Sequence, residues 1–403
     1  MLMEMGEFET TEEEHRMKPK MGMHRLPHVD YSQAPFLVIW ELTQSCDLAC
    51  RHCRASAQPN PDAAELTTEE GKGLLRQVAA MGTPIFILSG GDPLKRKDLF
   101  ELVRYGADLG LRMATIPAAT DLLTEDVVVR LKEAGLSQMA LSLDYPRADL
   151  HDAFRGLPGA FAKTMQAAEW AHKHDLPLQI NTTIHAGSLP YLEEIAALVE
   201  TMDVVFWEVF YLVPTGRGTG LGGLTAQECE RTFELLYKVQ KQADYLVKIT
   251  EAPHFRRYVT QKERHAEGMR ARPLQGESLT MPEQLTRTEG PGHTIGLAPQ
   301  GVNSGNGFLF VSHRGEIYPS GFLPLRAGNV RHHRVEWVYR HSPVFRQLRT
   351  PAQLKGVCGE CEFNALCGGS RSRAFALTGD YLASDPWCVY RPARKDSPVV
   401  PAA

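Results

Sequence analysis

The chain lacks long hydrophobic runs, a strong excess of charge and internal repeats at solenoid spacing. Its most apolar strand-like stretch, residues 204–213, contains Glu208 and is about half as long as a membrane-spanning helix. The acidic N-terminus, MLMEMGEFETTEEEH, does not have the basic-then-apolar order of a signal peptide. The net charge of −4 gives no general attraction to nucleic acid or to anionic membranes. We therefore expect a cytoplasmic protein without nucleic-acid or membrane partners.

Cysteine is scarce in this chain but concentrated. Of the eight cysteines, all but Cys229 fall within residues 46–53 and 358–388. Thiols stay reduced in the cytoplasm, so tight groups of cysteines there indicate metal or redox chemistry rather than disulfides. Cys229 lies in a predicted helix and is most simply a small buried apolar side chain.

Between residues 35 and 243, strand-like and helix-like segments alternate six times. The expected strands span residues 36–42, 85–88, 111–115, 138–143, 178–183 and 204–212. Two of the intervening helices begin with capping-box patterns, Thr67 with Glu70 and Thr225 with Glu228. Alternating strands and helices predict parallel strands joined by right-handed crossovers. The predicted fold class is therefore α/β, a partial (β/α)6 TIM-type barrel, followed by a smaller cysteine-rich domain.

Composition divides the rest of the chain. Residues 1–30 are charged and aperiodic and are expected to form a mobile extension, and residues 31–245 hold the barrel. Residues 246–300 are basic and without sustained period, which predicts either a lid or a solvated connecting loop. A β-hairpin near residues 308–318 opens the cysteine-rich domain, residues 301–392, and residues 393–403 form a tail.

The first cysteine group, Cys46, Cys50 and Cys53, lies on the loop that leaves the first strand. Thiolates are soft ligands suited to iron–sulfur clusters, and this spacing lets one loop wrap one cluster. Three ligands leave one iron of a cubane free to bind a cofactor or substrate. A zinc site completed by His52 is the alternative that the spacing leaves open.

Each predicted strand ends in a loop of polar or small residues. After the first strand come the cysteines, and the later loops are residues 89–93, 115–120, 142–144, 181–183 and 213–218. Barrel-like α/β folds build their active sites at these strand ends. Each loop alone is an ordinary turn, but six together predict a shared site.

These loops resemble those of the radical S-adenosylmethionine (SAM) superfamily over about residues 35–220. The resemblance implies that Cys46, Cys50 and Cys53 hold a [4Fe–4S] cluster whose open iron binds SAM. Reduction by a donor such as flavodoxin or ferredoxin then cleaves SAM to a 5′-deoxyadenosyl radical, which abstracts a substrate hydrogen. The cofactor contacts that it implies are Ser89, Gly90, Gly91, Asp92 and Pro93 near the SAM amino group, Ser142 and Asp144 near the ribose, and Asn181. Arg155 is a candidate partner for the SAM carboxylate, with a surface arginine as the alternative.

The second cysteine group comprises Cys358, Cys361, Cys367 and Cys388, enough to close a metal site. Spacing alone leaves structural zinc and an iron–sulfur cluster equally open. The region resembles the SPASM or twitch domains that follow radical SAM barrels, which favours iron–sulfur. Two cysteine positions of full SPASM domains are occupied here by Ser320 and Arg371. The resemblance therefore implies one auxiliary [4Fe–4S] cluster, and two clusters in total.

The C-x2-C-x5-C-x20-C tail, with CxxxCxHC at the front, is similar to radical SAM enzymes of alternative haem and haem d1 biosynthesis. This implies haem-synthase-like oxidative decarboxylation of porphyrin propionates, with the auxiliary cluster accepting an electron. A SPASM-type maturase acting on a ribosomally made peptide is the alternative, although the first 30 residues look too short for a peptide-binding module. A zinc-stapled binding or regulatory protein on an inactive barrel is a hypothesis of a different class.

Overall fold

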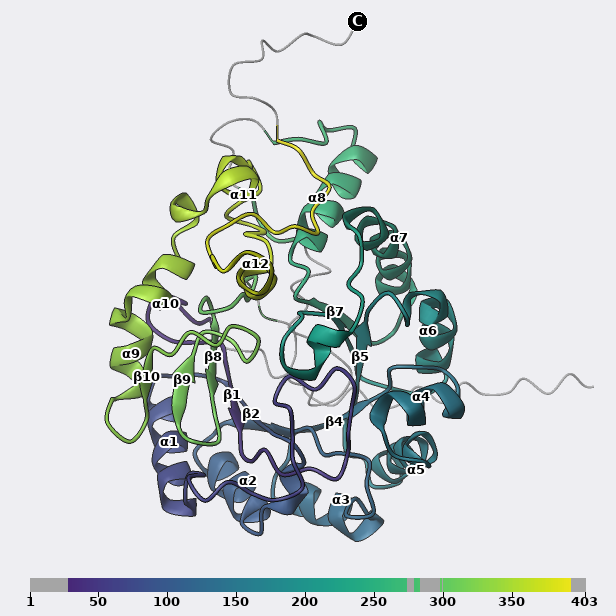
Figure 1. Ribbon diagram of the computed structural model, residues 1–403, viewed down its shortest axis with the longest axis vertical. Coiled ribbons are helices and arrows are strands. Elements are labelled where there is room, and N and C mark those ends of the chain that lie inside the picture. The colour runs from purple at the N-terminus through teal and green to yellow at the C-terminus, as the bar shows by residue number, and fades with distance from the viewer. Residues whose placement is uncertain (1–27, 274–278, 283–297, 299, 393–403) are drawn as a thin grey trace, which may run out of the picture.

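The computed structural model describes residues 28–273, 279–282, 298 and 300–392, and its centre is one curved sheet (Figure 1). The strand order is β10-β9-β8-β1-β2-β3-β4-β5-β6-β7. Strands β1 to β7 run parallel in chain order, whereas β8 pairs parallel with β1 and continues antiparallel into β9 and β10. Their bounds are β1 Leu37–Glu41, β2 Ile85–Ser89, β3 Arg112–Thr115, β4 Gln138–Ser142, β5 Leu178–Ile184, β6 Phe206–Tyr211, β7 Leu246–Thr250, β8 Phe308–Val311, β9 Glu316–Tyr318 and β10 Gly328–Asn329.

Helices surround the outside of this sheet (Figure 1). The barrel helices are α1 Thr68–Ala80, α2 Leu99–Asp108, α3 Glu125–Glu133, α4 Ala148–Arg155, α5 Ala160–Lys173, α6 Leu192–Glu200 and α7 Ala226–Gln242. Both predicted capping boxes are present, at Thr67 with Glu70 and at Thr225 with Glu228. The later helices are α8 His254–Ala266, α9 Val335–His341, α10 Pro343–Leu348, α11 Gly356–Glu360 and α12 Arg371–Thr378. The partial-barrel fold class is confirmed.

The two faces of the sheet have different roles because successive strand residues point to opposite sides. In β5, Gln179, Asn181 and Thr183 line an internal cavity, whereas Leu178 and Ile180 belong to the main hydrophobic core under the helices. The same alternation holds in β1, β2, β4 and β6. The outer face therefore supplies the core and the inner face supplies the site.

The structure differs from expectation between residues 246 and 266. Strand β7 extends the parallel sheet beyond the predicted barrel end by pairing with β6. The first part of the expected long loop is helix α8, which buries Phe255, Tyr258 and Val259. These three are spaced as one helical stripe, which the surrounding charges concealed. The expected hairpin is confirmed as β8 and β9. Of the predicted N-terminal extension, the structure describes only residues 28–30. The predicted C-terminal tail, residues 393–403, lies outside the described residues.

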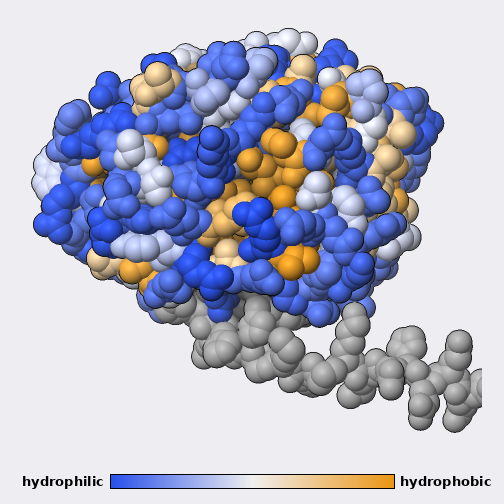
Figure 2. Space-filling model, turned by 90° about the horizontal axis from the view of Figure 1, so that it is seen from below, coloured by the Kyte–Doolittle hydropathy of each residue, from blue (hydrophilic) through white to orange (hydrophobic). Residues whose placement is uncertain are grey.

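The surface combines hydrophilic areas with a few apolar ones. Figure 2 shows one side of the molecule on which apolar side chains gather in a central region bordered by hydrophilic ones. In the described part of the chain, the large exposed apolar side chains are Leu109, Leu122, Met269, Trp337 and Leu377. Among the same residues, no helix has the length and apolar character needed to traverse a bilayer.

Candidate functional site: two cysteine-lined cavities

A cavity of about 390 Å³ opens on the inner face of the sheet. Most residues that the sequence singled out line it: Cys46, Cys50, Cys53, Ser89, Gly90, Gly91, Ser142, Arg155 and Asn181. Three predicted residues are not in its wall: Asp92, Pro93 and Asp144. The strand-end loops therefore do meet at one site, although not every side chain in them faces it.

Neighbouring loops hold the cysteine loop in place. The Arg217 side chain donates from Nε to the Cys50 carbonyl (2.8 Å) and from a terminal nitrogen to the Ala57 carbonyl (2.9 Å). Gly216 has a φ of +52°, and a Cβ there would lie 2.5 Å from the Cys53 carbonyl oxygen. Only glycine allows this approach and this backbone conformation. The loop after β6 therefore contacts the cysteine loop directly and holds it in place.

The thiols of this loop have a mixed environment. The backbone N–H groups of Leu48 and Ala57 each lie 3.4 Å from a thiol sulfur, those of Cys46 and Cys53. Burial raises the pKa of the Cys46 thiol to about 12 and also raises that of Cys50. The thiols of Cys46 and Cys50 are therefore protonated in the protein alone, and a metal must displace these protons to bind.

Arg155 connects the cysteine loop to the end of β4. Its guanidinium forms an ion pair with Asp144 (2.5 Å) and lies 3.7 Å from the Cys50 sulfur. Asp144 is 1% exposed and also accepts the backbone N–H of Thr183 (2.8 Å). Burial alone would raise the pKa of Asp144, but the Arg155 guanidinium holds it below its ordinary value. Asp144 therefore orients Arg155, and Arg155 is the member of the pair that faces the cavity.

Asp92 has a structural environment rather than a cavity-facing one. Its side chain is fully buried and accepts the backbone N–H groups of Leu94 (3.1 Å) and Ala118 (3.3 Å) and the hydroxyl of Thr120 (3.2 Å). Burial raises the pKa of Asp92 to about 6. The carboxylate thus ties the loop after β2 to the loop after β3, and of this loop Ser89, Gly90 and Gly91 line the cavity whereas Asp92 does not.

Replacing Asp92 by asparagine is expected to leave SAM affinity unchanged, because the amide oxygen can still accept both backbone N–H groups and the amide nitrogen can donate to the Thr120 hydroxyl. The folded-state pKa of Asp92 lies above its unfolded value, so wild-type stability falls as pH rises from about 4 to about 6. D92N lacks this loss, and denaturant titrations across that range should show the difference. D92A is the matched control and should lose about 1–3 kcal/mol by leaving buried donors unpaired. Weaker SAM binding by D92N at unchanged stability would show that the carboxylate contacts the cofactor.

The sequence interpretation named Asn181 but missed the row of polar side chains inside the barrel to which it belongs. Gln138 donates to Gln179 (2.6 Å), which donates to Asn181 (2.6 Å) and to Glu208 (3.0 Å). Glu208 also forms an ion pair with Lys248 (2.8 Å). All five line the cavity. In the sequence, these residues could have been recognised as polar side chains at every second position of strands that are otherwise apolar.

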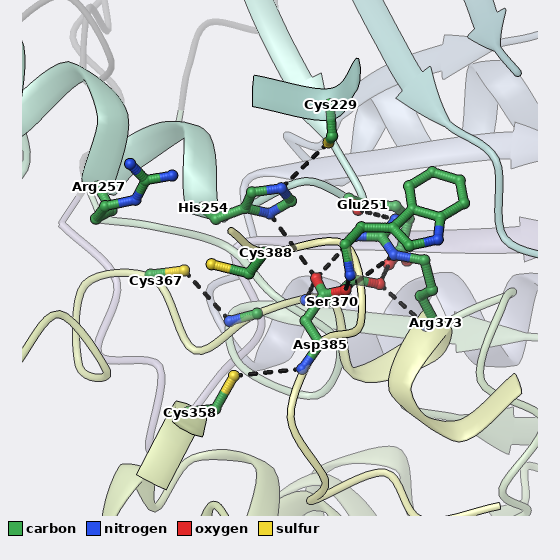
Figure 3. Close-up of polar contacts among 12 residues, drawn as sticks. Cys229, Glu251, His254, Arg257, Cys358, Cys367, Ser370, Arg373, Asp385 and Cys388 are labelled. Atoms are coloured by element: carbon green, nitrogen blue, oxygen red, sulfur yellow. Dashed lines mark hydrogen bonds and ion pairs between the residues drawn. The ribbon is translucent and has the colours of Figure 1, made fainter. Parts of the chain in front are cut away.

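A second cavity, of about 170 Å³, lies in the C-terminal region and is lined by Cys358, Cys361, Cys367 and Cys388. Figure 3 shows the sulfur atoms of Cys367 and Cys388 turned toward one another. Backbone N–H groups approach two of these sulfurs, Gly369 to Cys367 (3.3 Å) and Asp385 to Cys358 (3.4 Å). Burial raises the pKa of Cys361 to about 12 and also raises those of Cys367 and Cys388.

A buried ionic group supports this second cavity (Figure 3). Arg373 and Asp385, both fully buried, are joined by two hydrogen bonds of 2.9 and 2.7 Å. His254 lies between Asp385 and the thiol of Cys229, and burial lowers its pKa to about 3. Cys229 is fully buried and belongs to neither cavity wall, in agreement with its expected role.

Both thiol sets suit iron–sulfur clusters. Within the described ranges, no three His, Cys, Asp or Glu side chains converge as the ligands of a single ion would. The thiols instead border cavities, three in the large one and four in the small one. Thiolates around a space, with N–H groups directed at sulfur, match the donor set of a cluster.

Comparisons with known proteins agree with this geometry. The family model of the radical SAM superfamily matches residues 40–201. The AdoMet-dependent heme synthase of Oleidesulfovibrio alaskensis is 40% identical over 94% of this chain and 95% of its own. The PqqA peptide cyclase of Bradyrhizobium diazoefficiens is 28% identical over 89% of this chain and 87% of its own. A crystal structure of Streptococcus suis SuiB bound to S-adenosylmethionine shares the fold, with a TM-score of 0.66 and 14% identity over 89% of this chain and 78% of that one.

Proposed function

The chain belongs to the radical SAM superfamily, and from this membership we propose that it is a haem synthase that oxidatively decarboxylates two propionates of iron-coproporphyrin III. It is a radical SAM enzyme that binds SAM and an iron–sulfur cluster. The observation that carries the proposal is the 40% identity to an AdoMet-dependent heme synthase over nearly the full length of both chains.

In this proposal Cys46, Cys50 and Cys53 ligate the cluster that binds SAM. Ser89, Gly90 and Gly91, together with Ser142, Asn181 and Arg155, form the SAM-facing wall of the large cavity. The guanidinium of Arg155, already fixed by Asp144, suits the SAM carboxylate because it presents a rigid fork of donors. When bound, the clusters and SAM supply a 5′-deoxyadenosyl radical and a one-electron acceptor.

The remaining cavity wall suits a large, flat polycarboxylate. Apolar side chains such as Ile39, Ile87 and Phe308 exclude water from it. Lys248 and Arg256 add positive charge, and Arg256 donates to the carbonyls of Val302 (2.6 Å) and Leu366 (3.2 Å) without a carboxylate partner among the described residues. A propionate that loses a hydrogen atom from its β-carbon and then one electron breaks its C–C bond to give a vinyl group and carbon dioxide. A substrate acid would provide the counter-charge for Arg256, whereas Lys248 already pairs with Glu208 (2.8 Å).

We further propose that Cys358, Cys361, Cys367 and Cys388 ligate one auxiliary [4Fe–4S] cluster, giving two clusters in total. The four thiols around one small cavity support this assignment. A flavodoxin or ferredoxin would supply the reducing electron. The second candidate function, cyclisation or another modification of a ribosomally made peptide, has the 28% identity to a peptide cyclase in its favour.

Anaerobic incubation of the reconstituted protein with dithionite, SAM and iron-coproporphyrin III tests the proposal. We expect two successive losses from the porphyrin, each equal to the mass of carbon dioxide plus two hydrogen atoms, and at least one 5′-deoxyadenosine per loss. Metal-free coproporphyrin III is a suitable control for the need for iron. If 5′-deoxyadenosine forms but the porphyrin is unchanged, the superfamily chemistry stands and the substrate assignment is wrong.

A further inference from the structure

A thin wall, residues 369–371, separates the two cavities. Gly369 lines both of them, and Ser370 and Arg371 line the larger one. A Cβ on Gly369 would lie 2.7 Å from a terminal nitrogen of Arg371 and 3.2 Å from the Cys358 sulfur, and the φ of this glycine is +66°. A side chain here would separate the guanidinium from the sulfur. The glycine therefore lets Arg371 reach the second cavity from the wall of the first.

Arg371 is fixed almost completely by the protein. It is 3% exposed, and one terminal nitrogen donates to the carbonyls of Tyr381 (2.9 Å) and Ala383 (2.7 Å). Its Nε lies 3.3 Å from the Gly369 carbonyl. The other terminal nitrogen lies 3.7 Å from the Cys358 sulfur. The guanidinium thus has a single available orientation, and in that orientation it donates to a cysteine of the second group.

The charge of Arg371 has no carboxylate within ion-pair distance among the described residues, in contrast to two nearby buried arginines. Asp380 forms its ion pair with Lys355 (2.6 Å) and interacts with Arg371 only at longer range. Arg373 is paired with Asp385, and Arg257 is paired with Glu230 through two hydrogen bonds of 2.8 and 2.6 Å. A buried cation surrounded by neutral acceptors is costly unless an anion lies close to it. A Cys358 thiolate would be that anion.

We propose that Arg371 donates a charged hydrogen bond to the Cys358 ligand of the auxiliary cluster and thereby raises the reduction potential of that cluster. This inference rests on the proposed function, because it requires the auxiliary cluster. Reduction adds one negative charge to a cluster that four thiolates already make anionic, so a fixed cation beside it stabilises the reduced state more than the oxidised state. Hydrogen bonds to sulfur and nearby charge are recognised determinants of cluster potential. Arg371 acts through the cluster and does not touch the substrate. Its effect is to make the cluster a better acceptor for the electron that the substrate releases.

The test is a redox titration of the auxiliary cluster in the full chain with Cys46, Cys50 and Cys53 replaced by alanine, so that the other cluster adds no signal. In this background we compare Arg371, R371M, R371Q and R371K by electron paramagnetic resonance at controlled potentials. We expect R371M and R371Q to lower the ratio of reduced to oxidised cluster at least tenfold at a fixed potential, equivalent to about 59 mV for one electron. R371K, which keeps the charge, should recover part of this shift. The control R346M removes an exposed arginine of α10 and should change nothing.

The outcomes separate this inference from the proposed function. If R371M leaves the reduction potential of the auxiliary cluster unchanged, the inference is overturned. If R371M does not retain iron, R371Q replaces R371M in the comparison. A potential in R371K as low as in R371M would show that the charge has no effect and would also overturn it. If the parent protein with the three alanines contains no iron–sulfur cluster, the auxiliary-cluster assignment itself fails.

Discussion

Replacing Cys46, Cys50 and Cys53 together by alanine is expected to abolish 5′-deoxyadenosine formation and to remove about half of the bound iron. The three thiols are the only cysteines in the described wall of the large cavity, so no other thiol there can replace them. The second group should keep its cluster because its four thiols border a separate cavity. Anaerobic reconstitution, followed by iron and acid-labile sulfide analysis and chromatographic assay of 5′-deoxyadenosine, measures both effects.

Cys229→Ser provides the matched control, because it removes a thiol that lies in neither cavity wall while its hydroxyl can keep the contact with His254. It should retain all of the iron and the ability to cleave SAM. Loss of all iron from the triple variant would contradict the assignment of an independent auxiliary cluster. Continued SAM cleavage by the triple variant would contradict the assignment of the first cysteine group.

The sequence predicted the parts of the fold that depend on local pattern. All six expected strands are present within a few residues of their predicted bounds, and both capping boxes formed as their residues indicate. The pairing of β8 with β1, such as Leu37 with Phe308, joins segments far apart in the chain and has no local signal. Helix α8 was missed because its charged residues dominate the composition, whereas Phe255, Tyr258 and Val259 are the apolar members of its buried side.

The site was predictable to the level of loops but not of side chains. The rule that active sites form at strand ends brought the correct loops together. It could not reveal that Asp92 turns toward Leu94 and Ala118, because that depends on the path of two neighbouring loops. The rule also could not reveal the ion pair between Asp144 and Arg155, because that contact forms only when helix α4 places Arg155 over the end of β4. The sequence indicated that Arg371 stands where full SPASM domains have a cysteine, but only the structure showed its contact with Cys358.

The Asp144–Arg155 pair has two separable roles, one in stability and one in cofactor binding. Asp144 is almost fully buried, so removing Arg155 alone leaves a buried carboxylate without its partner. Breaking a buried ion pair in this way costs about 3–5 kcal/mol. Removing both charges avoids that penalty, since asparagine at position 144 can still accept the backbone N–H of Thr183. The double variant D144N/R155M therefore tests the role of Arg155 in binding without a large loss of stability.

We expect R155M to unfold about 3–5 kcal/mol more easily than the wild type, and D144N/R155M to be close to the wild type in stability. Both variants should bind SAM roughly 10- to 100-fold more weakly, because each loses a charged hydrogen bond worth about 1.5–3 kcal/mol. Urea titration and anaerobic calorimetry on the reconstituted proteins measure the two effects separately. Wild-type SAM affinity in D144N/R155M would mean that Arg155 supports only the Cys50 loop and that the SAM carboxylate is held elsewhere. Weak binding in a stable double variant would instead establish that Arg155 contacts the cofactor, with Asp144 acting through it.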